Sequence, residues 1–402
     1  MVAPKLRFQE FDDAWNKKRL DSFLERISNP VDVVADQQYT QIGIRSHGKG
    51  IFHKGSIDGK ELGNKRVFWI EPNTLVVNIV FAWERAIAVT SDSEKGMIAS
   101  HRFPMYLPKK NLSNVNFLRY FFVTNKGQKY LELASPGGAG RNKTLGQSNF
   151  AELKIDLPSL KEQTKIANFL SAVDEKISQF NQKHELLSQY KQGMMQKLFS
   201  QQIRFKADDG SEFGEWEDKR ISEIASYRRG SFPQPYGLPE WLNENGFPFV
   251  QVYDVADNML LKDKTKIKIS QLAANQSVFA KTGTLIITLQ GSIGRVAKMQ
   301  YDAYVDRTLL IFQSYSMPIN TDYFKYALYL LFNIEKEKAD GGIIKTITKE
   351  TLSKFNIGIP CLEEQTKIAN FLSAMDQKIE IAAQQIEQAK QWKKGLLQQM
   401  FV

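Results

Sequence analysis

The chain has 402 residues and a formal net charge of +10, with 42% hydrophobic and 24% charged residues. This length predicts two domains, the composition is that of a globular protein, and the basic charge favours an anionic partner such as nucleic acid. A single cysteine and four histidines exclude an internal disulfide and argue against a Cys/His metal cluster. No apolar run is long enough to span a bilayer, so we expect no membrane association and a cytoplasmic location.

The segment EQTKIANFLSA occurs at 162–172 and again at 364–374. The match extends to other segments, since RFQEFDDAWNKKRL at Arg7–Leu20 resembles RFKADDGSEFGEWEDKRI at Arg204–Ile221. Between these flanks the two halves differ strongly. The sequence therefore predicts an internal duplication in which a variable region and a constant segment alternate. We place the boundaries of the variable regions at 1–157 and 202–359, and those of the constant segments at 158–201 and 360–402.

Both constant segments carry apolar residues at 4-3-4-3 spacing, which predicts long helices with a coiled-coil seam. The first seam comprises Ile166, Leu170, Val173, Ile177, Phe180, His184, Leu187, Lys191, Met194 and Leu198. The second comprises Ile368, Leu372, Met375, Ile379, Ala382, Ile386, Ala389, Lys393, Leu396 and Met400. Each seam needs a partner, so we expect the helices to pair. The repeat favours an antiparallel pair, which would make the molecule resemble a two-fold dimer fused into one chain.

Three polar residues interrupt the seams: His184, Lys191 and Lys393. They could contact a partner or DNA. A simpler interpretation is a polar position that fixes the register, together with lysines whose ammonium groups reach solvent.

A second apolar stripe lies beside the seams and also repeats. Its residues are Phe169, Tyr190, Met195 and Phe199 in the first helix, and Phe371, Trp392, Leu397 and Phe401 in the second. These side chains are candidates for docking another subunit, and packing on the chain's own variable regions is an equal alternative.

Each variable region contains runs typical of strands, followed by a helical stretch. The strand-like runs are RVFWI, TLVVNIVFAW and AIAVT in the first region, and PFVQVYDV, TLIITLQ and DRTLLIFQ in the second. The helical stretches are NFLRYFFVTNKGQKYLEL and TDYFKYALYLLFNIEKEK. We therefore expect an α+β fold: two similar mixed domains, each with a curved sheet, separated by two long antiparallel helices.

Several loops combine basic, aromatic and small polar residues with glycine. Glycine permits close approach of the backbone to a phosphate, Arg and Lys neutralise phosphates or bind guanine, and Gln, Asn and Ser can hydrogen-bond to bases. The candidate DNA-binding residues are Arg45, His47, Lys49, Arg85, Arg141, Lys143, Tyr227, Arg228, Arg229, Gln290, Ser292, Arg295 and Lys345. Ordinary solvated loops are the alternative for each of them. The sequence shows no convincing catalytic set and no glycine-rich cofactor loop between a strand and a helix.

The arrangement as a whole resembles the specificity subunit of a type I restriction–modification enzyme. The resemblance is carried by the two divergent regions, each followed by EQTKIANFLSA after LPSLK or IPCLE, and by LQGSIGRVAK in the second region. It implies that each variable region binds one half of a split, asymmetric site in double-stranded DNA, and that the helices fix the gap.

The resemblance also implies two methyltransferase subunits that carry S-adenosylmethionine and two motor–nuclease subunits that use ATP and Mg²⁺. This chain would then be a non-catalytic subunit without a cofactor or metal of its own. The sequence is also compatible with two other interpretations. One is a stand-alone DNA-binding regulator, whose second apolar stripe would be buried within the chain. The other is a nuclease or another enzyme.

Overall fold

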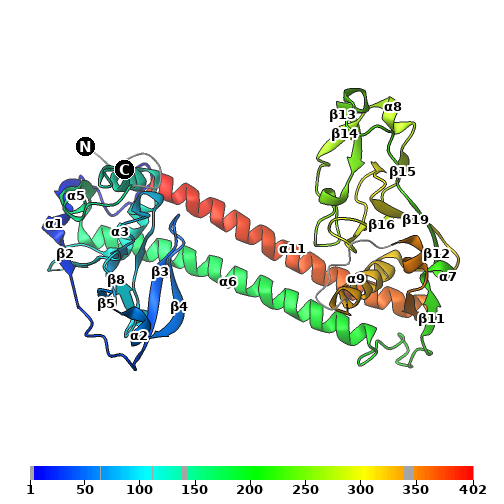
Figure 1. Cartoon of the computed structure of the whole chain (residues 1–402), viewed down its shortest axis with the longest axis horizontal. Coiled ribbons are helices and arrows are strands. Elements are labelled where there is room, and N and C mark those ends of the chain that lie inside the picture. The colour runs from blue at the N-terminus through cyan, green and yellow to red at the C-terminus, as the bar shows by residue number, and fades with distance from the viewer. Residues whose placement is uncertain (1–3, 64, 111, 138–142, 339–347, 402) are drawn as a thin grey trace. The chain divides into compact units, whose positions relative to one another are not determined.

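The computed structural model describes residues 4–63, 65–110, 112–137, 143–338 and 348–401. The chain forms two compact units (Figure 1). Residues 1–182 and 382–402 make up the first unit, and residues 183–381 make up the second. The end of the second constant segment thus belongs to the unit that contains the first variable region. This confirms that the second helix returns toward the start of the chain.

The first variable region and the first constant segment contain these elements: β1 (Asn16–Arg19), α1 (Leu20–Phe23), β2 (Leu24–Ile27), β3 (Gln38–Ile44), β4 (Ile51–Asp58), α2 (Gly59–Leu62), β5 (Val67–Trp69), β6 (Leu75–Val77), η1 (Ala82–Glu84), β7 (Ile87–Val89), η2 (Asp92–Glu94), β8 (Ile98–Ser100), β9 (Met105–Pro108), α3 (Val115–Phe122), α4 (Asn125–Leu133), α5 (Gln147–Glu152), β10 (Lys154–Leu157) and α6 (Leu160–Phe199).

The remainder of the chain contains these elements: β11 (Glu217–Arg220), α7 (Ile221–Ile224), β12 (Ala225–Arg229), η4 (Pro239–Trp241), β13 (Leu242–Val250), η5 (Val252–Asp254), β14 (Ile267–Ile269), α8 (Gln271–Ala274), β15 (Val278–Ala280), β16 (Leu285–Thr288), β17 (Val296–Lys298), β18 (Ala303–Val305), β19 (Leu309–Tyr315), α9 (Thr321–Lys338), α10 (Lys349–Ser353), β20 (Asn356–Ile359) and α11 (Leu362–Gln399).

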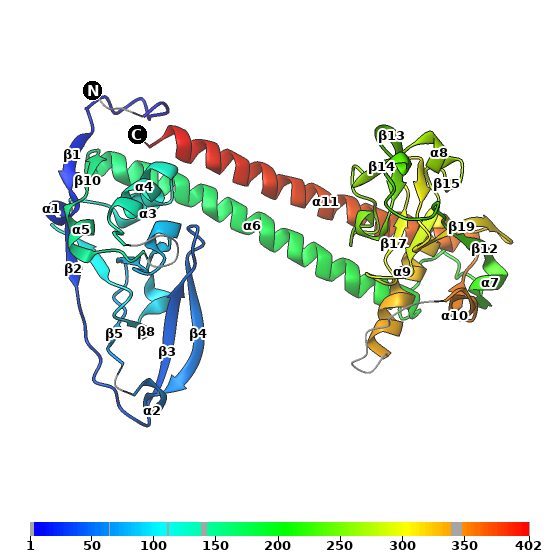
Figure 2. The ribbon, with the colours of Figure 1, turned by 45° about the horizontal axis from the view of Figure 1, so that its top comes forward.

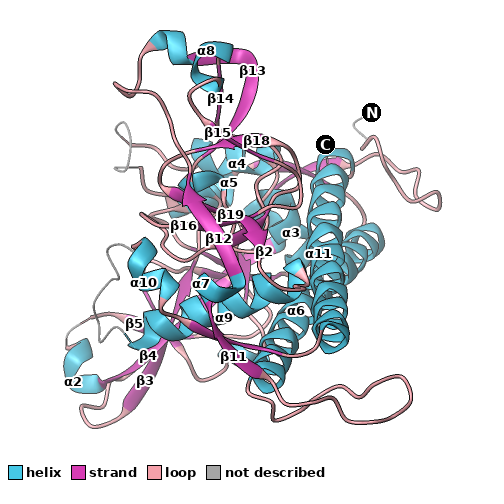
Figure 3. Cartoon of the chain, turned by 90° about the vertical axis from the view of Figure 1, so that its right-hand side faces the viewer, coloured by secondary structure: helices cyan, strands magenta, loops and turns pink. Residues whose placement is uncertain are grey.

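The two variable regions share one sheet topology. The first has sheets in the order β2-β9-β6-β7 and β4-β3-β8-β5, with β3 and β4 forming the hairpin seen in Figure 2. The second repeats these orders as β12-β19-β16-β17 and β14-β13-β18-β15, and the pairing of β12 with β19 can be followed in Figure 3. A short antiparallel pair, β1 with β10 or β11 with β20, precedes each long helix. The mixed fold is confirmed, but each region has two four-stranded sheets where one curved sheet was expected.

The central strand of one sheet shows why these apolar runs form buried strands. In β6, Leu75 and Val77 contribute to the core that includes α3, α6 and the end of α11, whereas Val76 packs in a second core toward β3 and β8. Alternate side chains of a strand point to opposite faces, so a run that is apolar throughout is buried on both sides. In the second unit, β16 has the same arrangement, with Ile286 facing away from Leu285 and Ile287.

The two long helices run antiparallel. Within the first unit, the start of α6 and the end of α11 contribute to a single core, and within the second unit the end of α6 packs with the start of α11 (Figures 1 and 3). All the seam residues expected from the sequence are buried or half-buried. A residue such as Ile166 or Ile368 is almost fully enclosed, whereas His184 and Leu187 in the middle of α6 are only half-buried.

The first two residues of the repeated motif attach each variable region to its helix. Glu162 is buried and accepts two hydrogen bonds from Arg7, at 2.7 and 2.8 Å, and one from the indole of Trp15 at 3.2 Å. Gln163 accepts from the backbone N–H of Asn114 and donates to the carbonyl of Pro158, both at 2.9 Å. The first two residues of the motif are therefore buried polar groups with hydrogen-bond partners in the variable region and at the start of the helix.

The second copy makes the same contacts. Glu364 binds Arg204 at 3.0 and 2.7 Å and the indole of Trp216 at 3.0 Å. Gln365 accepts from the N–H of Asn320 and donates to the carbonyl of Pro360, both at 2.9 Å.

One predicted helix is divided in two. The stretch expected as a single helix forms α3 and α4, which are separated by Val123 and Thr124. The hydroxyl of Thr124 accepts a hydrogen bond from the N–H of Gly127 and so caps the start of α4. A threonine cap competes with helix continuation at this position.

Candidate nucleic-acid interface

Two loops of the first variable region are joined through their backbones. The turn after β3 supplies His47 and Gly48, and the loop after β6 supplies Glu84 and Arg85. The N–H of His47 donates to the carbonyl of Glu84 at 2.7 Å, and the N–H of Gly48 donates to the carbonyl of Arg85 at 3.0 Å. The Ser46 hydroxyl donates to the Glu84 carboxylate at 2.8 Å. The two loops therefore form one connected surface.

Gly48 permits a third segment to join this surface. It has a φ of +66°, and a Cβ at this position would lie 2.7 Å from Cγ1 of Val123, between α3 and α4. A side chain would be strained there and would also clash. From the neighbouring loop, Nη1 of Arg85 donates to the carbonyl of Val123 at 3.2 Å.

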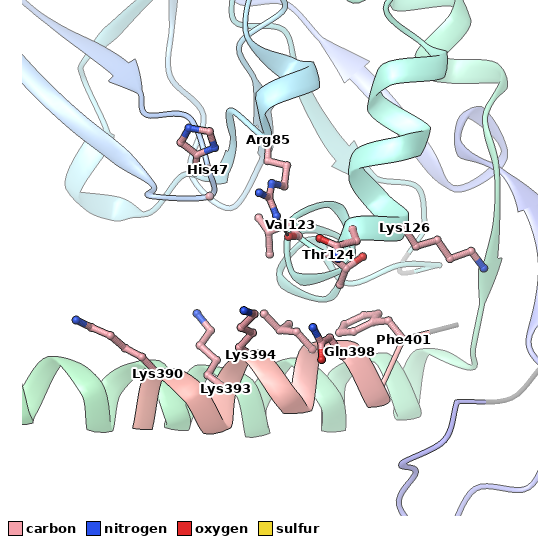
Figure 4. A pocket seen from close by; sticks show the side chains of 13 residues that line it. His47, Arg85, Val123, Thr124, Lys126, Lys390, Lys393, Lys394, Gln398 and Phe401 are labelled. Carbon is pink, nitrogen blue, oxygen red and sulfur yellow. Dashed lines mark hydrogen bonds between the residues drawn. The ribbon is translucent and has the colours of Figure 1, made fainter. Parts of the chain in front are cut away.

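A cavity of about 580 Å³ lies between these segments and the last turns of α11. Figure 4 shows Lys390, Lys393 and Lys394 extending from α11 toward the loop that carries Arg85. The basic side chains that line it are His47, Arg85, Lys126, Lys390, Lys393 and Lys394. The apolar side chains of Val123, Leu397 and Phe401 line other parts of the wall, and none of the described lining residues is a carboxylate. The cavity is therefore suited to an anionic group.

The predicted DNA-binding residues of the first region lie partly on this surface. His47 and Arg85 line the cavity. Arg45 and Lys49 are exposed on the same turn as His47, and the Arg45 guanidinium lies 4.7 Å from the ring centre of Phe52. Lys143 is half-buried beside the Trp83 ring, at 5.9 Å. Arg141 lies outside the described residues, as does Lys345 of the second region.

In the second region, Arg228 and Arg229 are exposed at the end of β12. Tyr227 corrects an expectation: its ring is buried, packs against Phe312, and belongs to the core. Burial raises the pKa of its hydroxyl. Alternation along β12 turns Tyr227 inward and Arg228 outward, so Tyr227 is not placed to stack on a base.

The loop between β16 and β17 contains three further candidates. Gln290 and Ser292 are exposed. Arg295 is half-buried and is bound to its own chain, since Nη1 donates to the carbonyl of Val255 at 3.0 Å and Nη2 lies 2.7 Å from a carboxylate oxygen of Asp257. Gly294, with a φ of +73°, brings this loop against Phe332 of α9.

Several basic residues at these surfaces were not anticipated from the sequence. Lys390 and Lys394 lie in a constant helix, where they match the usual solvated face of a coiled coil. Arg307 is exposed, with its guanidinium 4.9 Å from the ring centre of Tyr236. Lys262, Lys264, Lys266 and Lys268 are also exposed. Their spacing of two residues was a visible signal, although lysines also protect an edge strand such as β14 from pairing with another chain.

The second apolar stripe packs largely within each unit. Met195 and Phe401 are buried, and Phe199 stacks on Tyr323 with ring centres 5.3 Å apart. Phe169, Phe371 and Leu397 are half-buried against the cores. Tyr190 and Trp392, which are related by the repeat, stay 52% and 54% exposed. These two alone among the candidate docking residues present most of their rings to solvent.

Among the residues that the structure describes, no group of three or more His, Cys, Asp or Glu side chains is placed to hold a metal ion. Within the same ranges, no helix combines the length and apolar character needed to cross a bilayer.

Two units of common topology that present different loops, and that share a pair of repeated helices, define a duplicated two-domain protein. The family model described as "Type I restriction modification DNA specificity domain" matches residues 16–188 and 214–391. The matched residues cover most of the chain, and the chain therefore belongs to this family. The resemblance inferred from the repeated segment is confirmed.

Curated relatives and solved structures agree with this assignment. The chain is 24% identical to the putative type I restriction enzyme MjaX specificity subunit of Methanocaldococcus jannaschii, over 98% of this chain and 94% of the relative. It is 28% identical to the MjaVIII specificity subunit of the same organism, over 62% of this chain and 61% of that one.

Two solved structures share the fold. The crystal structure of the type I restriction–modification S subunit from M. genitalium matches with a TM-score of 0.62 and 16% identity, covering 100% of this chain and 99% of that one. A chain from a study of complex assembly and conformational transition of the type I system matches with a TM-score of 0.60 and 18% identity, covering 96% and 97%.

Proposed function

We propose that this chain is the DNA-specificity subunit of a type I restriction–modification complex, in which each variable region reads one half of a bipartite, asymmetric site. The proposal rests mainly on one observation: equivalent loops of the two variable regions have the same backbone closure but different side chains. The loop between β6 and β7 closes through the N–H of Asn78 and the carbonyl of Ala86 at 2.9 Å. The equivalent loop, between β16 and β17, is closed by a hydrogen bond from the N–H of Thr288 to the carbonyl of Arg295 at 3.0 Å. Common scaffolds with different polar groups suit two modules that read different bases.

In this proposal the two long helices fix the gap between the half-sites. Each helix contributes residues to both units. A helix rises ~1.5 Å per residue, so its length sets a spacing, as the geometry of a dimeric DNA-binding protein sets the separation of its half-sites.

The chemistry is assigned to partner subunits. Two methyltransferase subunits would carry S-adenosylmethionine and dock on the helices, with Tyr190 and Trp392 as the retained docking residues. Two motor–nuclease subunits would supply ATP- and Mg²⁺-dependent steps. The complex would act on double-stranded DNA in the cytoplasm, and this chain would contribute recognition and no reaction step.

A region swap tests the proposal. Replacing residues 15–156 by the matching region of another specificity subunit should change one half of the recognised site and preserve the other, because the region-to-helix contacts are made by the repeated motif. Mapping of methylated adenines in cells that produce the complex gives the result. The reciprocal swap of residues 216–358 guards against a single misfolded chimera. If either swap changes both halves of the site, the two variable regions do not recognise their half-sites independently, and the proposal is contradicted.

A stand-alone DNA-binding regulator is the second candidate, and one observation favours it. Met195, Phe199 and Phe401 of the second stripe pack within their own units, as expected for a chain without partner subunits. Co-purification with a methyltransferase subunit separates the candidates. Binding that is lost in Tyr190→Ala and Trp392→Ala variants supports the specificity subunit, and a chain that binds its site but no methyltransferase supports the regulator.

A further inference from the structure

We propose that α11 itself holds DNA phosphates beside the first half-site through Lys390 and Lys394, and that α6 provides no equivalent hold at the second. The inference rests on the proposed function and deepens it, because it assigns DNA contacts to a constant helix as well as to the variable loops. It also predicts that the two ends of the helix pair differ in their contacts with DNA phosphates.

The lysines in the cavity differ in whether their charges are already paired. Lys126 is 3.0 Å from Asp156, and Lys393 forms a salt bridge with Asp174. Lys394, by contrast, has no ion-pair or hydrogen-bond partner among the described residues. Lys390 has only Glu387 at 2.8 Å, and both side chains of that pair are more than half exposed. Exposed pairs of this kind contribute little, so the charges of Lys390 and Lys394 are available to a ligand.

The opposite wall supplies a third unsatisfied cation. The Nε of Arg85 is buried and has no hydrogen-bond partner among the described residues. Its Nη1 is fixed on the carbonyl of Val123 at 3.2 Å, so the guanidinium is held in place across the cavity from α11 (Figure 4). The residue lines the cavity, so an anion there would meet its positive charge.

A DNA backbone fits this cavity better than an acidic protein segment does. The wall opposite α11 is formed by the turn and loop that also present Arg45, His47 and Lys49. Phosphate contacts position a protein on the duplex while neighbouring side chains reach base edges. A strand that enters the cavity would thus pass directly beside the residues best placed to read bases.

The two copies of the constant helix differ at these two lysines. Lys393 and Gly395 of α11 match Lys191 and Gly193 of α6, but Lys390 and Lys394 correspond to Ser188 and Gln192. Lys390 and Lys394 are both exposed, so helix packing does not account for them. The two helices therefore share Lys393, which pairs with Asp174, and differ at Lys390 and Lys394, the two cavity lysines whose charges are available.

The test replaces these lysines by the residues of the other copy. The Lys390→Ser/Lys394→Gln variant, assembled in the full complex, is titrated with its recognised duplex over a range of salt concentrations. We expect weaker binding, a salt slope that is less steep by about 1.8 for two lost phosphate contacts, and unchanged half-site bases. The matched control is Lys183→Gln/Lys378→Gln, which removes two exposed charges from the same helices outside the cavity and should leave the slope near that of the unmodified complex.

Three results would overturn the inference. Unchanged affinity and slope would show that the lysines do not meet DNA, and a slope reduced equally in the control would show a general effect of charge. Loss of methyltransferase binding with intact DNA affinity would assign the cavity to an acidic protein segment. If the unmodified complex shows no sequence-specific binding, the proposed function fails as well, and this outcome is distinct from the three above.

Discussion

Lys393 of α11 forms a salt bridge with Asp174 of α6. The same carboxylate accepts a hydrogen bond from the hydroxyl of Tyr120 at 2.7 Å. Burial raises the pKa of Tyr120 to about 12. Since Tyr120 belongs to α3, the contact joins the two long helices to the first variable region. We call this group of three side chains the first clasp.

The repeat reproduces the clasp in the second unit. Lys191 pairs with Asp376, which accepts from the hydroxyl of Tyr326 at 2.6 Å. The lysines that interrupt the seams thus have partners that only an antiparallel pair in this register provides. The sequence interpretation had the ammonium groups of Lys191 and Lys393 reaching solvent, whereas the structure pairs them with carboxylates of the other helix, which ties them to the register of the pair.

The first clasp should contribute measurably to stability. Asp174→Asn leaves the half-buried Lys393 without its anion, and we expect a loss of about 1–2 kcal/mol in the free energy of unfolding. Denaturant titration measures it. Asp36→Asn removes the partner of Lys60 in a pair whose side chains are 72% and 83% exposed, and should change stability by less than about 0.5 kcal/mol. Equal effects of both substitutions would show that the clasp contributes no more than a surface pair.

The attachment of the first variable region should depend on Glu162. Its side chain is 2% exposed and that of Arg7 is 13% exposed. Glu162→Gln leaves the Arg7 charge nearly buried without an anion, so we expect a loss of about 3 kcal/mol in unfolding free energy. The control Glu10→Gln alters a pair with Lys165 that is half exposed on both sides. Limited proteolysis should cleave the N-terminal segment faster only in Glu162→Gln, and equal rates would contradict this role.

Glu94 should make the first variable region sensitive to acid. Burial by itself would raise the pKa of Glu94, but hydrogen bonds from His53, Ser91 and Ser93 outweigh it and lower the pKa to about 2 from the usual 4.5. A depressed pKa stabilises the fold above about pH 4.5, and that contribution disappears as the pH falls toward 2. The shift corresponds to about 3 kcal/mol.

The acid sensitivity is measured by comparing the unmodified chain with Glu94→Gln. The stability difference between them should be largest near pH 6 and should fall to less than about half of that value near pH 3. A difference that stays constant over this range would show that the carboxylate charge is not responsible.

Arg228 and Arg229 should contribute to reading the second half-site. Alanine at either position should weaken DNA binding, and if the side chain contacts a base edge, discrimination at that position should relax by roughly 1–3 kcal/mol. Competition binding with single-base variants of the site measures both effects. Arg220→Ala, which alters an exposed arginine of β11, a strand that pairs with β20 and not with β12, is the matched control, and Tyr227→Phe should leave DNA affinity unchanged. Unaltered affinity and preference in both arginine variants would remove this strand end from the DNA surface.

The helix pair should act as a ruler for the gap. Inserting seven residues after Phe180 and seven after Ala382 keeps the seam in phase, and both points lie at the junction of the two units. Each helix lengthens by about 10.5 Å at ~1.5 Å per residue, or roughly three base pairs at ~3.4 Å each. Mapping of methylated adenines should show unchanged half-sites with a wider gap. An unchanged gap with full activity, or altered half-site bases, would mean that the helices do not set the spacing.

The local pattern of the sequence was sufficient for the helices and their pairing. Ile166, Leu170 and Val173 recur at the spacing that places them on one helix face, and the duplicated segment supplied the only matching seam. Because a coiled coil is stabilised by this periodic face, its partner and direction could be inferred before any tertiary contact was known. The duplication and the family followed from the same repeat.

The placement of site residues could be predicted less well. Tyr227 and Arg228 are adjacent in a loop-like segment, and only their pairing with β19 turns one into the core and the other outward. The split between α3 and α4 depends on a single threonine cap. The apolar pattern on both sides of this threonine favours one continuous helix, so the local sequence does not show that the cap prevails.

The sequence by itself thus determined the duplication, the two long helices and the class of protein, because these depend on periodicities between near neighbours. The tertiary structure decided which basic residues share a surface. Arg85 and Lys394 are far apart in the chain, and they line one cavity because the antiparallel return of α11 brings its last turns beside the first variable region. Such a juxtaposition arises from the packing of distant elements, and no local pattern of residues encodes it.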